Sequence, residues 1–286
     1  MFVISGVTGN VGSVAARELL SKGHKVKVIV RDAVKGAAWS KQGAEVAVGS
    51  LDDAGFLTQA LTGAKGFFAM VPPPPVTTLD FYGDQNKTIY GISAAIKAAQ
   101  LPFVVLLSSI GADLSTGNGP IKGLHRMESA LRDSGRKWVA IRAGFFQENT
   151  GNLLAAAKGA GIYPSFMPNP DIAMSRVATK DIGKLASEVL INEPHHSEII
   201  DLQGSPYSDR EIAEKLGTAL GKKLSVVTIP EAGWIGAMTQ AGMSKHLAEV
   251  YAEMYHGASS GIFQLKGDRA VQATTPIDDV IKTLTT

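Results

Sequence analysis

The chain has 286 residues, of which 45% are apolar and 19% charged, a composition typical of a compact globular protein rather than a disordered one. Its net charge of +2 gives no strong basic field, so we expect no direct nucleic-acid partner and no membrane surface. The absence of cysteine excludes disulfides and thiolate chemistry, and because no histidine or carboxylate set has metal-site spacing, we predict no metal. Without a secretory signal or a long apolar run, a cytoplasmic location is expected.

The first thirty residues predict a strand, a glycine-rich turn, a helix and a second strand. Phe2–Ser5 is β-rich and leads directly into Gly6, Gly9 and Gly12, which stand three residues apart. Apolar residues then recur at helical spacing, and KVKVIV at 25–30 follows as a β-branched strand. In this context the first glycine permits a sharp turn, the second lets a pyrophosphate approach, and the third lets the helix pack on the strand. The pattern therefore predicts dinucleotide binding.

Strands and helices alternate up to about residue 150. The expected strands are 44–48, 66–71, 102–109 and 137–142, and the expected helices are 53–63, 80–100 and 121–134. Nearly continuous apolar strands that alternate with helices indicate a parallel sheet covered on both faces. The fold class predicted is therefore α/β, with a doubly wound, Rossmann-type parallel sheet.

The second half of the chain is less regular. Residues 161–174 contain three prolines and are expected to be irregular, whereas a helix at 179–192 and a strand at 197–202 return to the main sheet. A helix, a strand and two further helical stretches after residue 205 predict a smaller C-terminal lobe that covers the substrate. The expected division is a cofactor-binding Rossmann core at 1–150 plus 174–204, and a substrate-binding lobe at 151–173 plus 205–286.

The end of the second strand indicates which dinucleotide binds. Arg31 is the first residue after the strand and Asp32 is the second. An arginine at this place accommodates the 2′-phosphate of NADP, whereas an acid binds the ribose hydroxyls of NAD. Arg31 favours NADP, and Asp32 keeps NAD open as the less favoured alternative.

Several motifs follow one another in a fixed order along the whole chain. VTGNVG and VIVRD come first, followed by LLSSIGA at 106–112, HRMESALRDSG at 125–135 and AIRAGFFQEN at 140–149. With the segments at 49–73, 177–190 and 274–281, they resemble the NmrA-like family of atypical short-chain dehydrogenases/reductases. The resemblance implies an NADPH-dependent reductase of quinones or triphenylmethane dyes. The family's namesake, however, is a transcriptional co-regulator that binds dinucleotides without reducing a substrate.

Ligands of such sheets bind beyond the carboxyl ends of the strands. The resemblance places Leu51 at the adenine and Pro72 near the ribose and nicotinamide. Ser50 stands where the family often has aspartate, a departure that weakens the expected adenine contact. The cofactor-binding residues that we predict are Gly6, Thr8, Gly9, Asn10, Val11, Gly12, Arg31, Ser50, Leu51, Val71, Pro72, Ser108 and Phe145.

The acid–base pair of typical short-chain dehydrogenases is missing. Those enzymes carry Tyr-x-x-x-Lys on the helix after the fifth strand, and the helix expected at 121–134 contains no tyrosine. Ser109 stands where the superfamily places a substrate-binding serine, and Lys122 and His125 lie near the start of that helix. We take these three as candidate catalytic residues, with His125 as a proton relay, while Lys122 and His125 could equally be surface residues.

Two functions remain open at this point. The first is hydride transfer from NADPH to a quinone or similar planar aromatic acceptor, within a polyketide-type biosynthetic pathway, since such electrophiles need alignment more than a strong acid. The second is a non-catalytic NAD(P)-sensing regulator. Partners left open are a second copy of the chain and a partner oxygenase. An aromatic and methionine-rich group in the lobe would either cover a flat substrate or form core: Trp234, Met238, Met243, Tyr251, Met254, Tyr255 and Phe263.

Overall fold

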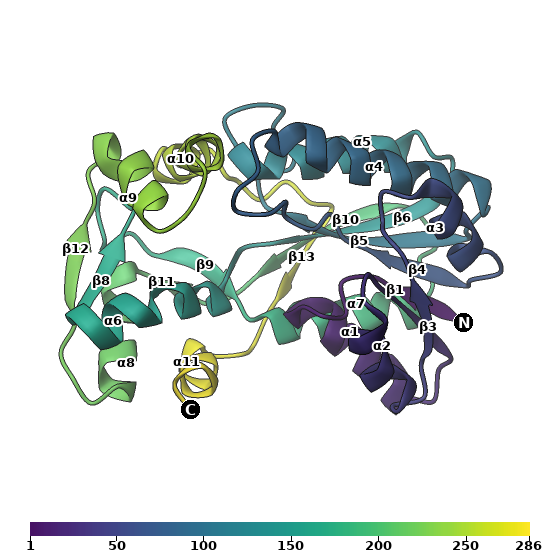
Figure 1. The fold of residues 1–286 in the computed structure, drawn as a ribbon, viewed down its shortest axis with the longest axis horizontal. Coiled ribbons are helices and arrows are strands. Elements are labelled where there is room, and N and C mark those ends of the chain that lie inside the picture. Colours follow the sequence, from purple (N-terminus) through teal and green to yellow (C-terminus); the bar gives the residue numbers. More distant parts are fainter.

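An eight-stranded parallel sheet runs through the larger part of the molecule (Figure 1). The computed structural model describes all 286 residues. The strands lie in the order β13-β10-β6-β5-β4-β1-β2-β3, so the strand order reverses beside β1, where doubly wound sheets bind their ligands. In chain order they are β1 (Phe2–Ile4), β2 (Val26–Val30), β3 (Glu45–Val48), β4 (Gly66–Ala69), β5 (Phe103–Ser109), β6 (Lys137–Ala143), β10 (Glu198–Gln203) and β13 (Arg269–Gln272).

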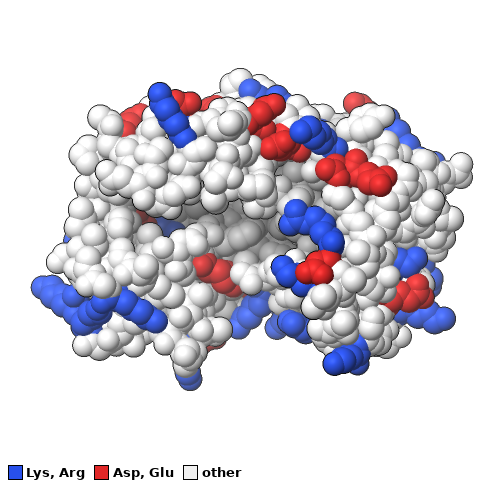
Figure 2. Space-filling view, viewed as in Figure 1, with Lys and Arg blue, Asp and Glu red and all other residues white.

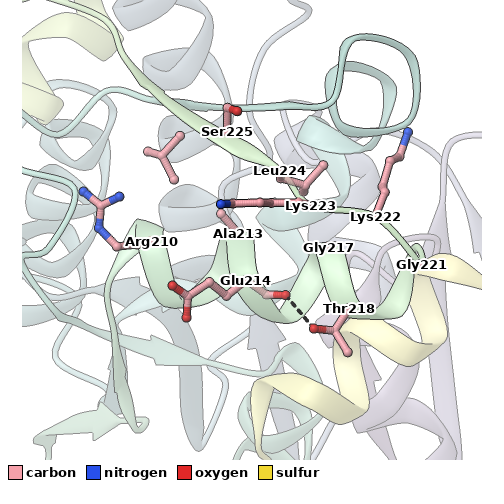
Figure 3. A pocket seen from close by; sticks show the side chains of 11 residues that line it. Arg210, Ala213, Glu214, Gly217, Thr218, Gly221, Lys222, Lys223, Leu224 and Ser225 are labelled. Atoms are coloured by element: carbon pink, nitrogen blue, oxygen red, sulfur yellow. Dashed lines mark hydrogen bonds between the residues drawn. The ribbon is translucent and has the colours of Figure 1, made fainter.

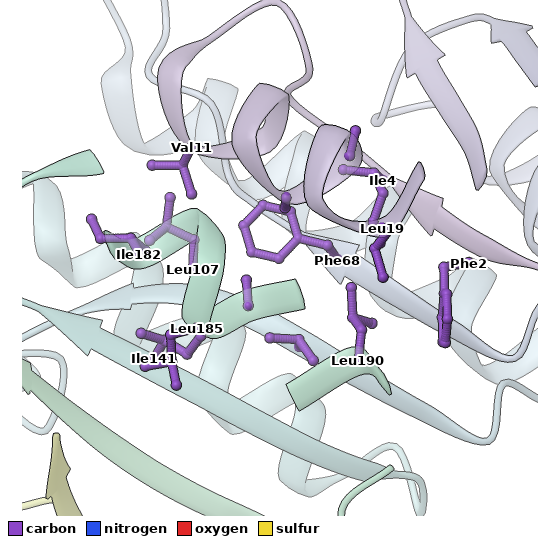
Figure 4. Close-up of a cluster of buried hydrophobic side chains, with 14 of the residues drawn as sticks. Phe2, Ile4, Val11, Leu19, Phe68, Leu107, Ile141, Ile182, Leu185 and Leu190 are labelled. Atoms are coloured by element: carbon purple, nitrogen blue, oxygen red, sulfur yellow. The ribbon is translucent and has the colours of Figure 1, made fainter. Parts of the chain in front are cut away.

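Helices cover both faces of this sheet, which confirms the predicted fold class (Figure 1). One face carries α1 (Asn10–Ser21), α2 (Ala33–Ser40) and α7 (Thr179–Ile191), and the other carries α3 (Ala54–Leu61), α4 (Phe81–Ala98) and α5 (Lys122–Arg132). Because strand residues alternate between faces, the side chains of β1 enter two separate cores. Figure 4 shows the first of them, in which Ile4 and Phe68 of the strands meet Leu19 of α1 and Leu185 of α7.

A smaller lobe stands beyond the carboxyl ends of the strands (Figure 1). Two small sheets belong to it, β8–β12 and β7–β9–β11, and apolar clusters lie between these sheets and the surrounding helices. The strands are β7 (Phe145–Phe146), β8 (Ile162–Ser165), β9 (Met174–Val177), β11 (Pro206–Tyr207) and β12 (Ser225–Thr228). The helices are α6 (Leu154–Ala160), α8 (Asp209–Ala219), α9 (Trp234–Gln240), α10 (Lys245–Ser259) and α11 (Ile277–Thr285), with short 3₁₀ turns η1 (Gly119–Ile121), η2 (Gln147–Leu153) and η3 (Glu231–Gly233).

Three features differ from the sequence-based expectations. The segment 161–174, expected to be irregular, contains β8, which tolerates Pro164 because it pairs with only one neighbour, β12. The range 205–286, expected to lie in the lobe, also supplies β13 at the edge of the main sheet. Helix α2 was not expected, and the Asp32 side chain caps it. None of the helices has both the length and the apolar character needed to cross a bilayer.

Candidate functional site

The turn between β1 and α1 holds two glycines that the packing requires. Gly6 adopts a φ of +68°, and a Cβ on it would collide with Sδ of Met70. A Cβ on Gly12 would lie 2.5 Å from the Ser5 carbonyl oxygen and 2.6 Å from the Gly6 carbonyl carbon. These two atoms belong to the backbone and cannot move aside as a side chain could. Helix α1 can therefore approach β1 this closely only because residue 12 lacks a side chain.

Gly9 is different, because nothing in the protein requires a glycine there. Its φ of −103° and ψ of 179° are extended values that any residue adopts, and a Cβ would lie 3.4 Å from Gly6 O, an ordinary contact. Gly9, Thr8 and Asn10 are exposed, whereas Val11 is buried. No side chain caps α1, and its first turn contains no acidic residue. The unpartnered N–H groups and positive end of α1 therefore stand behind an open surface that fits a phosphate.

The ends of β2 and β3 form the side of the site that would hold the adenosine. Arg31 is exposed and forms no ion pair within the chain. The Asp32 carboxylate is held against α2, because its Oδ1 accepts a hydrogen bond from Val34 N at 2.8 Å. Gly49 N donates to Val30 O at 2.9 Å, which keeps the half-buried Ser50 and Leu51 close to the end of β2. Of the two charged groups, the guanidinium is the one left available to a ligand.

Ser108 is used inside the protein rather than at the surface of the site. It is 3% exposed, and its hydroxyl donates to Glu128 Oε1 at 2.7 Å. The same carboxylate accepts two hydrogen bonds from Arg142, at 2.9 and 2.6 Å. Ser108 and Arg142 are direct neighbours across β5 and β6. This buried ionic network joins α5 to the carboxyl ends of β5 and β6, in the interior of the sheet. Its arginine was missed because it follows the apolar run WVAI within β6.

The three candidate catalytic residues lie within residues 109–125, but each of their side chains contacts a different group of the protein. Ser109 Oγ donates to Ile110 O at 3.0 Å. His125 Nδ1 lies 2.9 Å from Ala112 O, and since a carbonyl only accepts, Nδ1 carries the hydrogen. Neutral His125 therefore offers Nε2 only as an acceptor and donates a proton there only as the imidazolium. Lys122 Nζ is turned toward α4, 5.2 Å from the centre of the Tyr82 ring.

Tyr82 is not a substitute for the missing catalytic tyrosine. Its hydroxyl lies 3.3 Å from Gly119 O and 3.4 Å from Glu253 Oε2, so it is bound within the protein. Burial, together with the Glu253 carboxylate, raises the pKa of Tyr82 to about 12. A phenol held protonated in this way links α4 to α10 rather than acting as an acid.

The remaining predicted residues line the transition from the sheet to the lobe. Val71 is buried and Pro72 half-buried just after β4, and Phe145 is half-buried just after β6. The Phe145 ring centre lies 6.0 Å from Cζ of Arg176, a residue that sequence reasoning did not find because it lies in a strand of only four residues. Figure 2 shows a hollow across the middle of this face, with mostly uncharged walls, where the sheet meets the lobe.

The aromatic and methionine residues of the lobe divide into two groups. Trp234 and Met238 are almost fully buried and are lobe core, as one of the two readings predicted. Tyr255 is partly exposed and stacks on Phe166, with ring centres 4.9 Å apart. Phe263 packs toward Gly111 of the loop after β5, where an added Cβ would lie 2.8 Å from its ring.

A second depression, of about 750 Å³, lies between α8 and β12 at the far end of the lobe (Figure 3). Its walls are polar and basic, and it is remote from the carboxyl ends of the strands, so it is separate from the site described above. No group of three or more histidine and carboxylate side chains is arranged to hold a metal ion.

Comparison with known proteins gives a consistent picture. The NmrA-like family model matches residues 1–275. The chain is 27% identical over 256 residues to the NAD(P)H azoreductase of Xenophilus azovorans, covering 89% of this chain and 86% of that protein. It is 26% identical over 264 residues to quinone oxidoreductase 2 of Escherichia coli K12, covering 91% and 89%. The structure of Citrobacter sp. triphenylmethane reductase complexed with NADP(H) superposes with a TM-score of 0.84 at 20% identity, over 99% and 100% of the two chains, which shows a shared fold.

Proposed function

The chain belongs to the NmrA-like family, as its motifs predicted, and on this premise we propose that it is an NAD(P)H-dependent oxidoreductase that reduces a quinone or similar planar aromatic acceptor. The observation that carries the proposal is the exposed Gly9 in front of the uncapped N-terminus of α1, at the point where the strand order reverses. The azo, quinone and dye reductases among the similar proteins support the acceptor class, since all three kinds of acceptor are conjugated aromatic or quinonoid electrophiles that accept a hydride.

The chain's own residues fit a dinucleotide of the NADP type. The N–H groups of α1, with Thr8 and Asn10, would hold the pyrophosphate, and Arg31 would pair with the 2′-phosphate. Leu51 would contact the adenine, while Pro72 and Phe145 would lie beside the nicotinamide. When bound, the reduced nicotinamide supplies a hydride.

In this proposal the site holds the acceptor in line with the nicotinamide and supplies no strong general acid. Ser109 and His125 offer weak polar contacts beside Ile110, and water supplies the proton that a reduced quinone takes up. Planar acceptors of this kind occur in polyketide-type pathways, and we place the reaction there as a further hypothesis.

Single removals of the polar groups test this division of roles. We expect Ser109→Ala, Lys122→Met and His125→Ala each to lose less than the ~100-fold in kcat that marks a working general acid or base. Ile110→Trp, at a half-buried position directly after β5, should abolish turnover with quinones while NADPH affinity stays near that of the wild type. A thousandfold loss of kcat in His125→Ala with normal NADPH affinity would make His125 the proton donor and overturn this account.

A further inference from the structure

Four polar side chains form a cluster where the lobe joins the sheet, and the chemistry above does not use them. Arg176 of β9 and Asp209 of α8 are each 7% exposed, and Arg176 Nη2 lies 2.6 Å from Asp209 Oδ1. Tyr163 lies on β8, whose Ser165 donates to Asp209 Oδ2 at 2.6 Å, and Tyr255 of α10 stacks on Phe166, directly after β8. We call Tyr163, Tyr255, Arg176 and Asp209 the phenol cluster.

The two phenols have no partner inside the protein. Tyr163 is 2% exposed, yet neither its hydroxyl nor that of Tyr255 takes part in a hydrogen bond within the chain. Neither hydroxyl is among the fully buried polar atoms that lack a partner, so both hydroxyl oxygens reach accessible space where a ligand can meet them. Burial raises the pKa of Tyr163 and raises that of Tyr255 to about 12. Both hydroxyls therefore keep their protons and remain available as donors.

The phenol cluster is one side chain away from the carboxyl edge of the sheet. Phe145 and Arg176 are neighbours across β7 and β9, and the guanidinium lies over the Phe145 ring. On the other side, Tyr255 stacks on Phe166 with an angle of 11° between the rings. In Figure 1, β9 leads from the side of the lobe that holds β8 toward the main sheet. Through Arg176 the phenol cluster therefore adjoins Phe145, which the proposed function places beside the nicotinamide.

We propose that Tyr163 and Tyr255 donate hydrogen bonds to an oxygen of the acceptor, so that the site selects quinones and other oxygen-bearing acceptors over cationic dyes. The inference rests on the proposed function and names its substrate class. Reduction of a quinone consumes one hydride from the cofactor and one proton from water, and yields the hydroquinone and the oxidised cofactor. Negative charge develops on the quinone oxygens before the proton arrives, and fixed donors stabilise that charge. A triarylmethane cation has no such oxygen and loses its charge on reduction.

Tyrosine-to-phenylalanine variants separate this role from packing. Tyr163→Phe and Tyr255→Phe keep the ring and remove only the hydroxyl, and Tyr90→Phe, at a 70% exposed position on α4, is the matched control. With menadione as the quinone, we expect kcat/KM to fall about tenfold in each cluster variant, as for a lost hydrogen bond. With crystal violet, kcat/KM should stay within about twofold, and NADPH affinity should not change in any variant.

Measuring the binding of menadione provides a second test that does not depend on turnover. The ring centres of Trp234 and Tyr255 lie 5.9 Å apart, so menadione in the cluster should quench tryptophan fluorescence, with a Kd about tenfold weaker in Tyr163→Phe. Equal losses with both acceptors, or an unchanged menadione Kd in both cluster variants, would overturn the inference while leaving the reductase activity intact. Failure of the wild type to oxidise NADPH with any acceptor would instead sink the proposed function, and the menadione Kd would still decide the inference.

Discussion

The glycine turn allows ligand binding to be separated from folding with two substitutions three residues apart. In Gly12→Ala the new Cβ would meet the Ser5 carbonyl oxygen at 2.5 Å and Gly6 carbonyl carbon at 2.6 Å, and neither backbone atom can move cheaply. Overpacking of this kind costs about 1–3 kcal/mol, so the free energy of unfolding should fall by that amount. In Gly9→Val the Cβ meets only Gly6 O, at 3.4 Å, with the backbone already extended.

The stability of Gly9→Val should therefore fall by no more than about 1 kcal/mol, because the only expected cost is that valine is a poorer N-cap residue for α1 than glycine. Its branched side chain, however, fills the surface in front of α1 where the pyrophosphate would lie. Urea unfolding of both variants, combined with calorimetric titration of NADPH, measures the two effects separately. We expect Gly9→Val to bind NADPH at least tenfold more weakly, with a smaller shift of the unfolding midpoint than Gly12→Ala shows.

Two results would refute this reasoning. If Gly9→Val bound NADPH as tightly as the wild type, the turn would be a packing device and the pyrophosphate would lie elsewhere. If Gly12→Ala were as stable as the wild type, the close contact between α1 and β1 would not explain the third glycine.

Three further predictions follow from the charged and phenolic groups. Arg31→Ala should weaken NADPH binding by about 1.5–3 kcal/mol and NADH binding much less, whereas equal losses by calorimetry would show that Arg31 does not read the 2′-phosphate. Glu128→Gln removes the charged partner that Arg142 contacts at 2.6 Å and leaves the buried guanidinium only the more distant Asp113, at 3.9 Å, so urea unfolding should show a loss of about 3–5 kcal/mol, and a loss below about 1 kcal/mol would contradict the role of this ion pair. Because the pKa of Tyr255 rises from 10.0 to about 12 on folding, the folded state holds this proton more tightly than the unfolded state. Its contribution to stability should be complete below about pH 10 and lost as the pH rises to about 12, and phenolate absorbance at all tyrosines of the folded protein near pH 10 would contradict this.

The Rossmann half of the molecule could be predicted from sequence because its signals are local. The period changes from two to 3.6 at Gly12, and strands such as 102–109 are continuous apolar runs, so element type and order follow without tertiary information. The roles expected of Gly6 and Gly12 rest on backbone geometry and are visible in the contacts of the turn.

The lobe was less predictable because its elements depend on partners far away in the chain. Strand β8 carries a proline and exists only through pairing with β12, some sixty residues later. Strand β13 is short and largely exposed, with no apolar run to mark it, and its place beside β10 follows from the path of the chain after α10.

The polar groups of the site were the hardest to foresee. Glu128 lies in a polar stretch of its helix, and nothing in the sequence indicates its ion pair with Arg142 on a neighbouring strand. Arg176 and Tyr163 come from the proline-containing segment and the strand after it, and only the three-dimensional structure brings them together with Tyr255. No spacing along the chain encodes such a cluster.

The central claim is that this NmrA-like chain transfers a hydride from a nicotinamide cofactor to a planar aromatic acceptor. Anaerobic mixing of the protein with NADPH and menadione, followed by the loss of nicotinamide absorbance, tests it most directly, with Gly9→Val as the inactive control. We predict catalytic turnover that consumes one NADPH for each quinone reduced. Tight NADPH binding with no oxidation by any quinone, azo compound or dye would contradict the claim and favour a non-catalytic NAD(P)-sensing regulator.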